Sequence, residues 1–390
     1  MKRVNFNNRW HIVPGQTQLV TPLKYILPHT PPMLSRCNKP LAMDTEELLN
    51  ILTYYHLQEF SSGRELIQAL QEDDYARSLI APAGGIKRST FFDTVNDRGV
   101  EQLLYVFNEL QQNASVDLPA QYTELGELIA IDGSLIDSVL SMHWAEYRTN
   151  SKKAKLHLGF NLNKGIPRKL FLTEGTGAER PFVGRIIDSG QTAILDRGYQ
   201  AHHLFDQWQG DGCHFICRIK SKTHRELLDE IPISEGSIVF YDGRVLLGTP
   251  GINQTKKPVR LVGYTVEGKD YWVATDRFDI SAEQIAFAYK LRWNIENFFA
   301  WWKRHLKVYH LFARSRNGLM VQILSGLITY LLLAIYCQEE HGEPVTIVRV
   351  RQLRNRIRNE AMLLGINNSA ISHRQKKKLR RKMKKLHASP

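Results

Sequence analysis

The chain has 390 residues, of which 43% are hydrophobic and 23% charged, and this composition indicates a soluble globular protein with a core large enough for two or three domains. Its four cysteines (Cys37, Cys213, Cys217 and Cys337) are scattered, which excludes a disulfide framework and indicates a reducing compartment. Cys213 and Cys217 flank His214, but without a second pair of ligands this spacing predicts core packing over a zinc site.

Lys and Arg outnumber Asp and Glu by 52 to 39, and most of the resulting net charge of +13 lies at the C-terminal end. Residues 351–390 hold 13 basic residues and one acid, Glu360, so this segment carries +12. Such a segment is typical of a polyanion binder, most simply a nucleic-acid binder. We expect DNA contacts from Lys376, Lys377, Arg380 and Arg381. A membrane-surface helix, for which a strong apolar face is lacking, and a merely solvated chain end are the alternatives.

The first third of the chain predicts helices. Residues 1–40 are rich in Pro and Asn and indicate an irregular arm, and residues 41–120 show helical periodicity throughout. Within them, GGIKRSTFFDTV offers a glycine turn, the basic residues Lys87 and Arg88, and Ser89 as a helix N-cap. A short helix entered through a basic turn is how helix-turn-helix units meet DNA. An ordinary helical bundle explains the same pattern, and both interpretations stay open.

From residue 127 the hydrophobic period changes. Residues 121–230 contain five strand-like runs with helical segments near 179–189 and 200–209, which predicts a mixed α/β sheet with helices on its faces. Residues 231–279 predict an all-β insertion with hairpin turns at Asp242-Gly243 and at Gly268. Residues 280–345 return to helix and predict the second part of the core, and residues 346–390 form the basic tail.

Two acids stand at the ends of apolar strands, Asp132 in IAIDGS and Asp196 in ILDRGY, and each is followed closely by a glycine. Strand ends are where α/β folds place catalytic groups. With Glu296 on a helix, they give three carboxylates from separate elements, a set that can hold two hard cations beside a phosphate. A single strand-end Asp is more often a turn or helix cap, so the prediction of a metal site depends on the three acids occurring together.

Residues 281–306 predict one helix, capped by Ser281. At about 100° per residue, Tyr289, Arg292, Glu296 and Lys303 project from one narrow stripe. An acid beside a guanidinium, an ammonium and a phenol suits a carboxylate that stays ionised near a metal and a phosphate. The alternative is an ion-pair ladder on a solvated face, which the many aromatic residues of this helix disfavour because they imply burial.

Residues 319–337 approach the length of a membrane span. They contain Gln322, Ser325 and Thr329 and directly follow the helix with the charged stripe, so we interpret them as a buried core helix and expect no membrane contact. The polar N-terminal residues show no signal-peptide pattern.

The order Asp132, Asp196, Glu296 resembles the DDE triad of bacterial insertion-sequence transposases, which have a ribonuclease-H-like fold. The stripe from Tyr289 to Lys303 matches at every spacing the Y-(2)-R-(3)-E-(6)-K signature of the group called insertion-sequence family four. The segments KLHLGFNLNKGIPRKLFLTEG and LDRGY are also similar to that family, as is a β-rich insertion before the Glu. The resemblance covers roughly residues 125–340 and extends only loosely to the N-terminal helices, which it equates with a DNA-end-binding domain.

The resemblance implies cut-and-paste transposition through a DNA hairpin, with two Mg²⁺ ions (replaceable by Mn²⁺) at each active site and a homodimer in the synaptic complex. The expected partner is double-stranded DNA, both terminal inverted repeats and target, in the bacterial cytoplasm at the nucleoid. Hairpin formation flips a nucleotide out of the duplex, and an aromatic side chain lowers that cost by stacking. Trp272 and Trp293 are the candidates for this role, although both fit core packing as well.

Two other functions fit parts of the pattern. A metal-dependent nuclease of the same fold would cut strands without joining them. A non-enzymatic nucleic-acid-binding protein would rely on the basic tail and would not need the three carboxylates.

Overall fold

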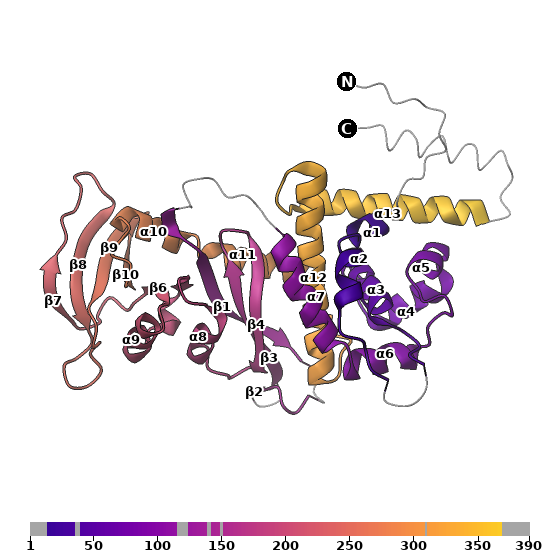
Figure 1. The fold of residues 1–390 in the computed structure, drawn as a ribbon, viewed down its shortest axis with the longest axis horizontal. Helices are drawn as coiled ribbons and strands as arrows, with labels where there is room; N and C mark the ends of the chain where they lie inside the picture. Colours follow the sequence, from indigo (N-terminus) through magenta and orange to yellow (C-terminus); the bar gives the residue numbers. More distant parts are fainter. Residues whose placement is uncertain are drawn as a thin grey trace, which may run out of the picture. The chain divides into compact units, whose positions relative to one another are not determined.

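The computed structural model describes residues 14–35, 40–114, 124–138, 142–148, 151–308 and 310–368. The chain divides into two compact units, one made of the residues up to Leu110 together with those from His305 onward, and one spanning Gln111–Arg304 (Figure 1). The finer boundaries predicted from the sequence, at 40, 120, 230, 279 and 345, stay predictions. Lys376, Lys377, Arg380 and Arg381 lie outside the described residues.

The first unit is helical. Its described helices are α1 (Gly15–Leu19), α2 (Leu23–Ile26), η1 (Leu27–His29), α3 (Thr45–Gln58), α4 (Gly63–Glu72), α5 (Asp74–Leu79), α6 (Arg88–Asp97), α7 (Val100–Asn113), α12 (Arg316–His341) and α13 (Ile347–Asn368). The start of α3 shows why such segments are helical: the Asp44 side chain accepts from the backbone N–H of Glu47, while the Glu47 side chain accepts from that of Asp44. This capping box satisfies N–H groups that a helix start otherwise leaves without partners.

Helix α12 is the apolar helix at residues 319–337. It is the one helix in the described parts of the chain long and apolar enough to span a membrane, yet 89% of its most apolar window is buried. Helices α3 and α6 pack against it. A buried polar contact fixes this packing, because His56 of α3 bonds Ser325 of α12 at 2.8 Å through one ring nitrogen and the backbone oxygen of Leu306 at 2.6 Å through the other. The interpretation as a core helix agrees with this burial.

The start of α6 differs from the expectation in its cap. Gly85 has a positive φ of 69° and forms the predicted turn. The N-cap is Lys87, however, and Ser89 lies inside the helix and makes no capping bond, so the predicted Ser89 cap is wrong. Lys87 and Arg88 are exposed, and the Arg88 guanidinium lies 5.9 Å from the centre of the Phe92 ring.

The second unit is built on a large mixed sheet. Its strands are β1 (Leu128–Asp137), β2 (Glu146–Arg148), β3 (Ser151–Asn161), β4 (Ile166–Glu174), β5 (Thr192–Leu195), β6 (His214–Arg218), β7 (Arg225–Glu230), β8 (Val239–Leu247), β9 (Val259–Val266) and β10 (Lys269–Thr275). The order is β2-β3-β1-β5-β6-β10-β9-β8-β7, and β4 pairs with β3 outside this order. Strands β1, β5 and β6 are parallel, and the neighbouring pairs are antiparallel. The predicted α/β class with a mixed sheet is confirmed, and residues 231–279 extend this same sheet through the pairing of β10 with β6.

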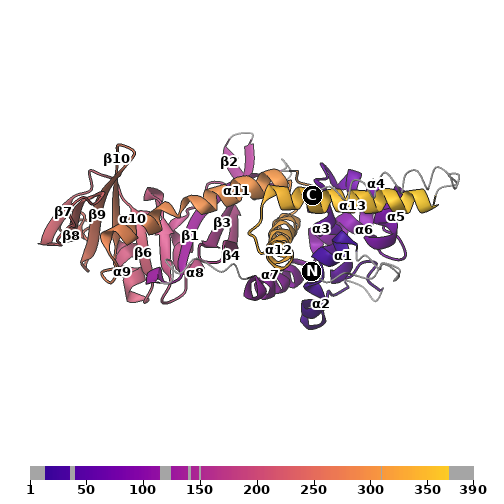
Figure 2. The same ribbon diagram turned by 90° about the horizontal axis from the view of Figure 1, so that it is seen from above.

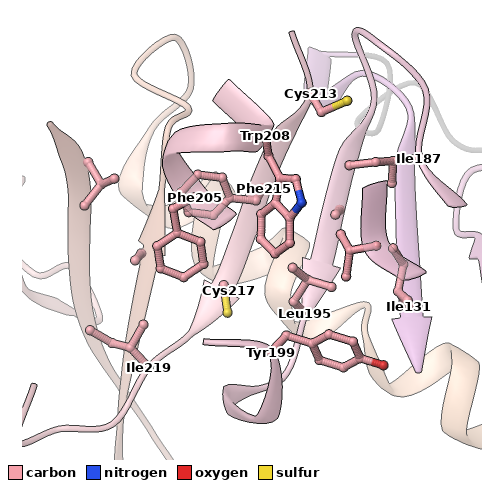
Figure 3. Close-up of a cluster of buried hydrophobic side chains, with 14 of the residues drawn as sticks. Ile131, Ile187, Leu195, Tyr199, Phe205, Trp208, Cys213, Phe215, Cys217 and Ile219 are labelled. Carbon is pink, nitrogen blue, oxygen red and sulfur yellow. The ribbon is translucent and has the colours of Figure 1, made fainter. Parts of the chain in front are cut away.

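Helices cover both faces of this sheet within the second unit (Figures 1 and 2). Helices α8 (Val183–Ile186) and α9 (His202–Gly210) pack on one face, and α10 (Ala282–Lys290) and α11 (Trp293–His305) on the other. Phe205, Trp208 and Phe215 form the centre of the core under α9 (Figure 3). Cys213 and Cys217 are buried in this cluster, as the sequence predicted.

The predicted hairpin turn at Asp242-Gly243 is wrong. Both residues lie in the middle of β8, whereas the predicted turn at Gly268 does connect β9 to β10. Asp242 is buried, and its burial is tolerated because the Arg260 side chain of β9 donates to both of its carboxylate oxygens, at 2.9 and 2.7 Å. An Asp-Gly pair is a common hairpin signal. Here an ion pair with Arg260 of the next strand compensates the charge of Asp242, so the pair can lie inside a strand.

The single helix expected over residues 281–306 is also wrong, because it is interrupted between α10 and α11. The N–H of Arg292 donates to the carbonyl of Tyr289, and that of Ile295 donates to Arg292, so three-residue bonds replace the four-residue bonds of an α-helix. No Gly or Pro marks the place, so the local sequence could not reveal the interruption.

We predict that Asp242→Ala destabilises the protein by about 3–5 kcal/mol, because it leaves the Arg260 charge buried without its partner. Urea unfolding followed by circular dichroism measures this change. The matched control is Asp229→Ala, which breaks an exposed ion pair with Arg244 between the neighbouring strands β7 and β8 and should cost roughly 1 kcal/mol or less. Equal losses in the two variants would contradict the structural role of the buried pair.

Candidate active site

Asp132 lies in the middle of β1, on the face of the sheet that α10 and α11 cover. The strand pairs with β3 without a bulge and places Asp132 opposite Leu158. Its side chains therefore alternate, with Ile129 and Ile131 in the core under α8 and α9, and Asp132 on the opposite face. The backbone N–H of Gly133 donates to Oδ1 of Asp132 at 2.9 Å, which fixes the orientation of the carboxylate.

The surroundings of Asp132 disfavour its charge. Burial raises the pKa of its carboxyl group to about 6. The Gly133 N–H and the Arg292 guanidinium work to lower that pKa, whereas the carboxylates of Glu179 and Glu296 raise it further. A half-buried carboxylate with other acids around it is a place where a cation is favourable.

Asp196 follows β5, the parallel neighbour of β1, and caps the short helix η4 (Arg197–Tyr199). The hydroxyl of Tyr289, in the last turn of α10, donates to Oδ1 of Asp196 at 3.4 Å. Tyr289 is buried, and burial raises the pKa of its phenol, so the group stays a neutral donor. The first and second acids therefore come from adjacent parallel strands. Asp196 follows its strand as predicted, whereas the predicted strand-end position of Asp132 is wrong, because β1 continues to Asp137.

Glu296 lies in the first turn of α11, where the helix dipole favours a negative charge. Arg292, only 7% exposed, donates from its Nη2 to Oε1 of Glu296 at 2.7 Å. Burial works to lower the pKa of the Arg292 guanidinium, but Tyr289, Glu296 and Asp196 raise it above its usual value. Since Arg292 also acts on Asp132, one guanidinium interacts with all three acids of the predicted triad.

Lys303 lies farther along α11 and points to the same strand as the first acid. Its Nζ donates to the backbone oxygen of Leu135 in β1 at 2.9 Å. Burial lowers the pKa of this ammonium, and the charges of Asp137 and Asp132 oppose the change. The stripe residues thus face strand β1 and the end of β5, although the helix is interrupted after α10.

The donor set fits a divalent cation in its chemistry. Asp132, Asp196 and Glu296 supply the oxygen ligands that Mg²⁺ prefers, and a bound cation would offset the burial that raises the pKa of Asp132. Across the described residues, however, no group of three or more His, Cys, Asp or Glu side chains is arranged closely enough to hold a metal ion. Arg292 occupies one oxygen of Glu296 instead, so metal binding requires these side chains to rearrange.

The two candidate tryptophans have different environments. Trp272 of β10 is packed between neighbours, with the Arg225 guanidinium 4.1 Å from its ring and Tyr241 at 5.3 Å between ring centres. Trp293 at the start of α11 is 57% exposed, and its ring lies 5.6 Å from the Arg292 guanidinium. Trp293 is therefore the more accessible aromatic surface beside the acids.

Sequence reasoning missed two charged residues near the site. Glu179 raises the pKa of Asp132, and its Oε1 lies 3.1 Å from the Nζ of Lys155. Arg218, at the end of β6, stacks over the Tyr271 ring at 4.9 Å and acts on Tyr289. The strand-end position of Arg218 was a usable signal, because β6 lies beside β5. Nothing in the local pattern around Glu179 marks it.

Comparison with known protein families identifies residues 124–332 as a match to the family described as "Transposase DDE domain". Among curated proteins, a probable transposase for insertion sequence element IS5377 from Geobacillus stearothermophilus is 29% identical over 49% of this chain and 51% of its own length. A putative transposase for insertion sequence element IS4SA from Synechocystis is 24% identical over 68% of this chain and 76% of its own length. The chain spans about half the length of the first of these relatives.

Among solved structures, the piggyBac transposase synaptic complex with hairpin DNA is similar over 90% of this chain and 78% of that chain, with 14% sequence identity and a TM-score of 0.44. We draw nothing further from a likeness of this size.

We predict that, without metal, Asp132→Asn is more stable than the natural protein at pH 7.5. The folded-state pKa of Asp132 is about 6, above the unfolded value of about 4, so the folded state binds more protons between these values and its stability falls as pH rises through that window. The advantage of the variant should shrink as pH falls towards about 4. Urea unfolding with a chelator present, at several pH values, measures it. Asp137→Asn, an exposed carboxylate of the same strand, is the control, and an equal effect in the two variants would contradict this account.

Proposed function

The chain belongs to the DDE transposase family, and from this premise we propose that it binds the ends of a DNA element and moves them by cutting and joining strands at Asp132, Asp196 and Glu296. The observation that carries the proposal is the position of Arg292, which interacts with all three acids although they come from β1, from the end of β5 and from α11. The order of β4, β3, β1, β5 and β6 supports the ribonuclease-H-like assignment of this sheet.

Asp132, Asp196 and Glu296 are the residues that would hold the divalent ions, with Mg²⁺ as the natural ion, two at each site, and Mn²⁺ as a substitute. When bound, such ions activate the attacking oxygen and stabilise the leaving oxygen of a phosphoryl transfer. The chain's own contribution is to orient the carboxylates: the N–H of Gly133 holds Asp132 and the Tyr289 hydroxyl holds Asp196. In this proposal the Arg292–Glu296 pair belongs to the metal-free state.

Arg292 and Lys303 are the groups we assign to the DNA backbone. A guanidinium released from Glu296 can grip a phosphate with two parallel donors, whereas the Lys303 ammonium acts as a single point charge. Lys303 is two turns beyond Glu296, about 10 Å along the helix axis, so it suits a phosphate next to the one that reacts. Tyr289 completes the group as a neutral donor beside Asp196.

The proposed reaction passes through a DNA hairpin, in which a base leaves the duplex and stacks on an aromatic ring. Trp293 supports this role by its exposure and its place beside Arg292. Trp272 would first have to lose the Arg225 guanidinium from its ring.

The proposed partners are the terminal repeats and target DNA, bound by a homodimer in the synaptic complex. The basic turn at Lys87 and Arg88, exposed at the start of α6, is the end-binding surface that we assign in the helical unit. The tail residues Lys376, Lys377, Arg380 and Arg381 add affinity that is independent of DNA sequence. The site of action is the bacterial cytoplasm at the nucleoid.

We predict that Asp132→Asn, Asp196→Asn and Glu296→Gln each abolish strand cleavage while changing the affinity for a transposon-end duplex by less than about threefold. The assays are gel-shift binding and cleavage of a labelled end in Mg²⁺. Joining of a pre-cleaved end to target DNA is measured beside them, because a nuclease of the same fold would cleave without joining. Retained cleavage in all three variants would exclude these carboxylates from the reaction, and DNA binding without any cleavage by the natural protein would leave only a nucleic-acid-binding function.

We predict that Arg292→Lys slows hairpin formation by at least about tenfold, because lysine cannot reproduce the two-donor grip on a phosphate. Lys303→Arg should be tolerated better, since a single positive charge is preserved. Single-turnover kinetics on a labelled transposon end measures both, beside a thermal melt of each variant. If the loss of rate follows the loss of melting temperature, the stripe has only a structural role.

A further inference from the structure

A short segment between β4 and α8 contacts the strands of both aspartates. It contains Glu179 and the 3-10 helix η3 (Arg180–Phe182). Phe182 stacks on the ring of His157 in β3, with 4.1 Å between ring centres and 15° between planes. This stacking holds the segment on the face of the sheet that α8 and α9 cover, which is the face opposite the Asp132 side chain.

The Glu179 carboxylate lies directly behind Asp132, against the next residue of β1. A Cβ atom added to Gly133 would lie 2.7 Å from Oε1 of Glu179, so only glycine leaves room for the carboxylate there. Gly133 is also the residue whose N–H holds Asp132 Oδ1. Because neighbouring side chains leave opposite faces of a strand, Glu179 reaches the backbone of the first acid's strand without reaching the first acid's own face.

Two further bonds fix this arrangement. Lys155 of β3 donates from its Nζ to the backbone oxygen of Gly177 at 2.9 Å and lies 3.1 Å from Glu179 Oε1, so the carboxylate is held in place from the neighbouring strand. Nε of Arg180 donates to the backbone oxygen of Gly198 at 2.9 Å, which is two residues after Asp196. Consecutive residues of one segment thus touch the strand of the first aspartate and the loop of the second.

A buried phenol lies in the same region. Tyr199 is 2% exposed, and its hydroxyl points towards the strand that carries Ile131 (Figure 3). Burial raises the pKa of this hydroxyl well above its usual value, and the charges of Glu179 and Asp132 raise it further. The Glu179 charge thus acts on this phenol on its own face of the sheet and on the Asp132 carboxyl on the opposite face.

We propose that Glu179 is a positioning residue of the metal site: held by Lys155 and packed on Gly133, it sets the place of Asp132, while Arg180 ties the Asp196 loop to the same segment. This inference rests on the proposed function, because it assumes that Asp132 and Asp196 bind the divalent ions. Glu179 does not itself bind the metal, since it lies on the other face of β1. Its negative charge adds to the field that attracts the cation, and its contacts hold the two aspartates in register.

The test measures Mn²⁺ binding to the DNA-free protein by electron paramagnetic resonance, together with the Mg²⁺ dependence of cleavage and a thermal melt. The main variant is Glu179→Gln, which keeps the shape of the side chain and removes its charge. Gly133→Ala is the second variant, because the added methyl group must displace the Glu179 carboxylate from its place against β1. Glu146→Gln is the matched control, since it removes an exposed acid paired with Lys152 of the same strand β3.

We expect Glu179→Gln to weaken Mn²⁺ binding by roughly tenfold, as is usual for residues that orient metal ligands. Its melting temperature should stay close to that of Glu146→Gln, and its cleavage rate should return when Mg²⁺ is raised. Gly133→Ala should likewise weaken Mn²⁺ binding and raise the Mg²⁺ concentration that cleavage requires.

Natural Mn²⁺ affinity in Glu179→Gln, or a loss of cleavage that follows melting temperature and that excess Mg²⁺ does not restore, would overturn the inference. Asp132→Asn, measured in parallel, separates this failure from that of the proposed function. If Asp132→Asn weakens Mn²⁺ binding and Glu179→Gln does not, only the positioning role is lost. If Asp132→Asn binds Mn²⁺ like the natural protein, the metal site and the inference both fail.

Discussion

The buried guanidinium of Arg292 is the charge on which the arrangement of the acids depends. Burial disfavours ionisation of Asp132, and the nearby Glu296 carboxylate adds to that cost. The ion pair between Arg292 and Glu296, at 2.7 Å, supplies the positive charge that keeps such a group stable in a protein interior. Releasing the guanidinium from these acids would be costly unless another positive charge compensated them, so its release and the binding of a cation would be coupled.

The same constraint explains why the site needs so many elements. Burying acids requires a sheet covered on both faces, and orienting them requires a donor for each: a backbone N–H for Asp132, a phenol for Asp196 and a guanidinium for Glu296. The donors come from β1, from the end of α10 and from the turn before α11. The three-residue hydrogen bonds of that turn place Arg292 between two helices, so a local departure from α-helical geometry serves the electrostatics of the site.

Much of this could be predicted from sequence, where the signal was periodic or consisted of an acid after an apolar run. Asp132 and Asp196 follow apolar runs whose strand character is unambiguous, and Glu296 stands in a stripe whose spacing survives the interruption of the helix. The features that were predicted wrongly or missed depend on residues far along the chain. Asp242-Gly243 has the composition of a turn, and only Arg260, from the next strand, explains why it is buried in a strand instead. Glu179 lacks any local pattern, because its significance comes from Gly133 and Lys155 on two other strands.

The discontinuity of the helical unit has a consequence for synthesis. Helices α3 and α6 bury their apolar faces against α12, which follows the entire Gln111–Arg304 unit in the chain. At 5–20 residues per second, a ribosome needs roughly 10 to 40 seconds to make that unit, and during this time the N-terminal helices have no α12 to pack against. The sheet unit is contiguous and can fold first. A truncated product that ends before α12 would therefore carry both aspartates and Glu296 in a folded sheet unit, joined to an N-terminal segment with exposed apolar surface that chaperones and proteases recognise.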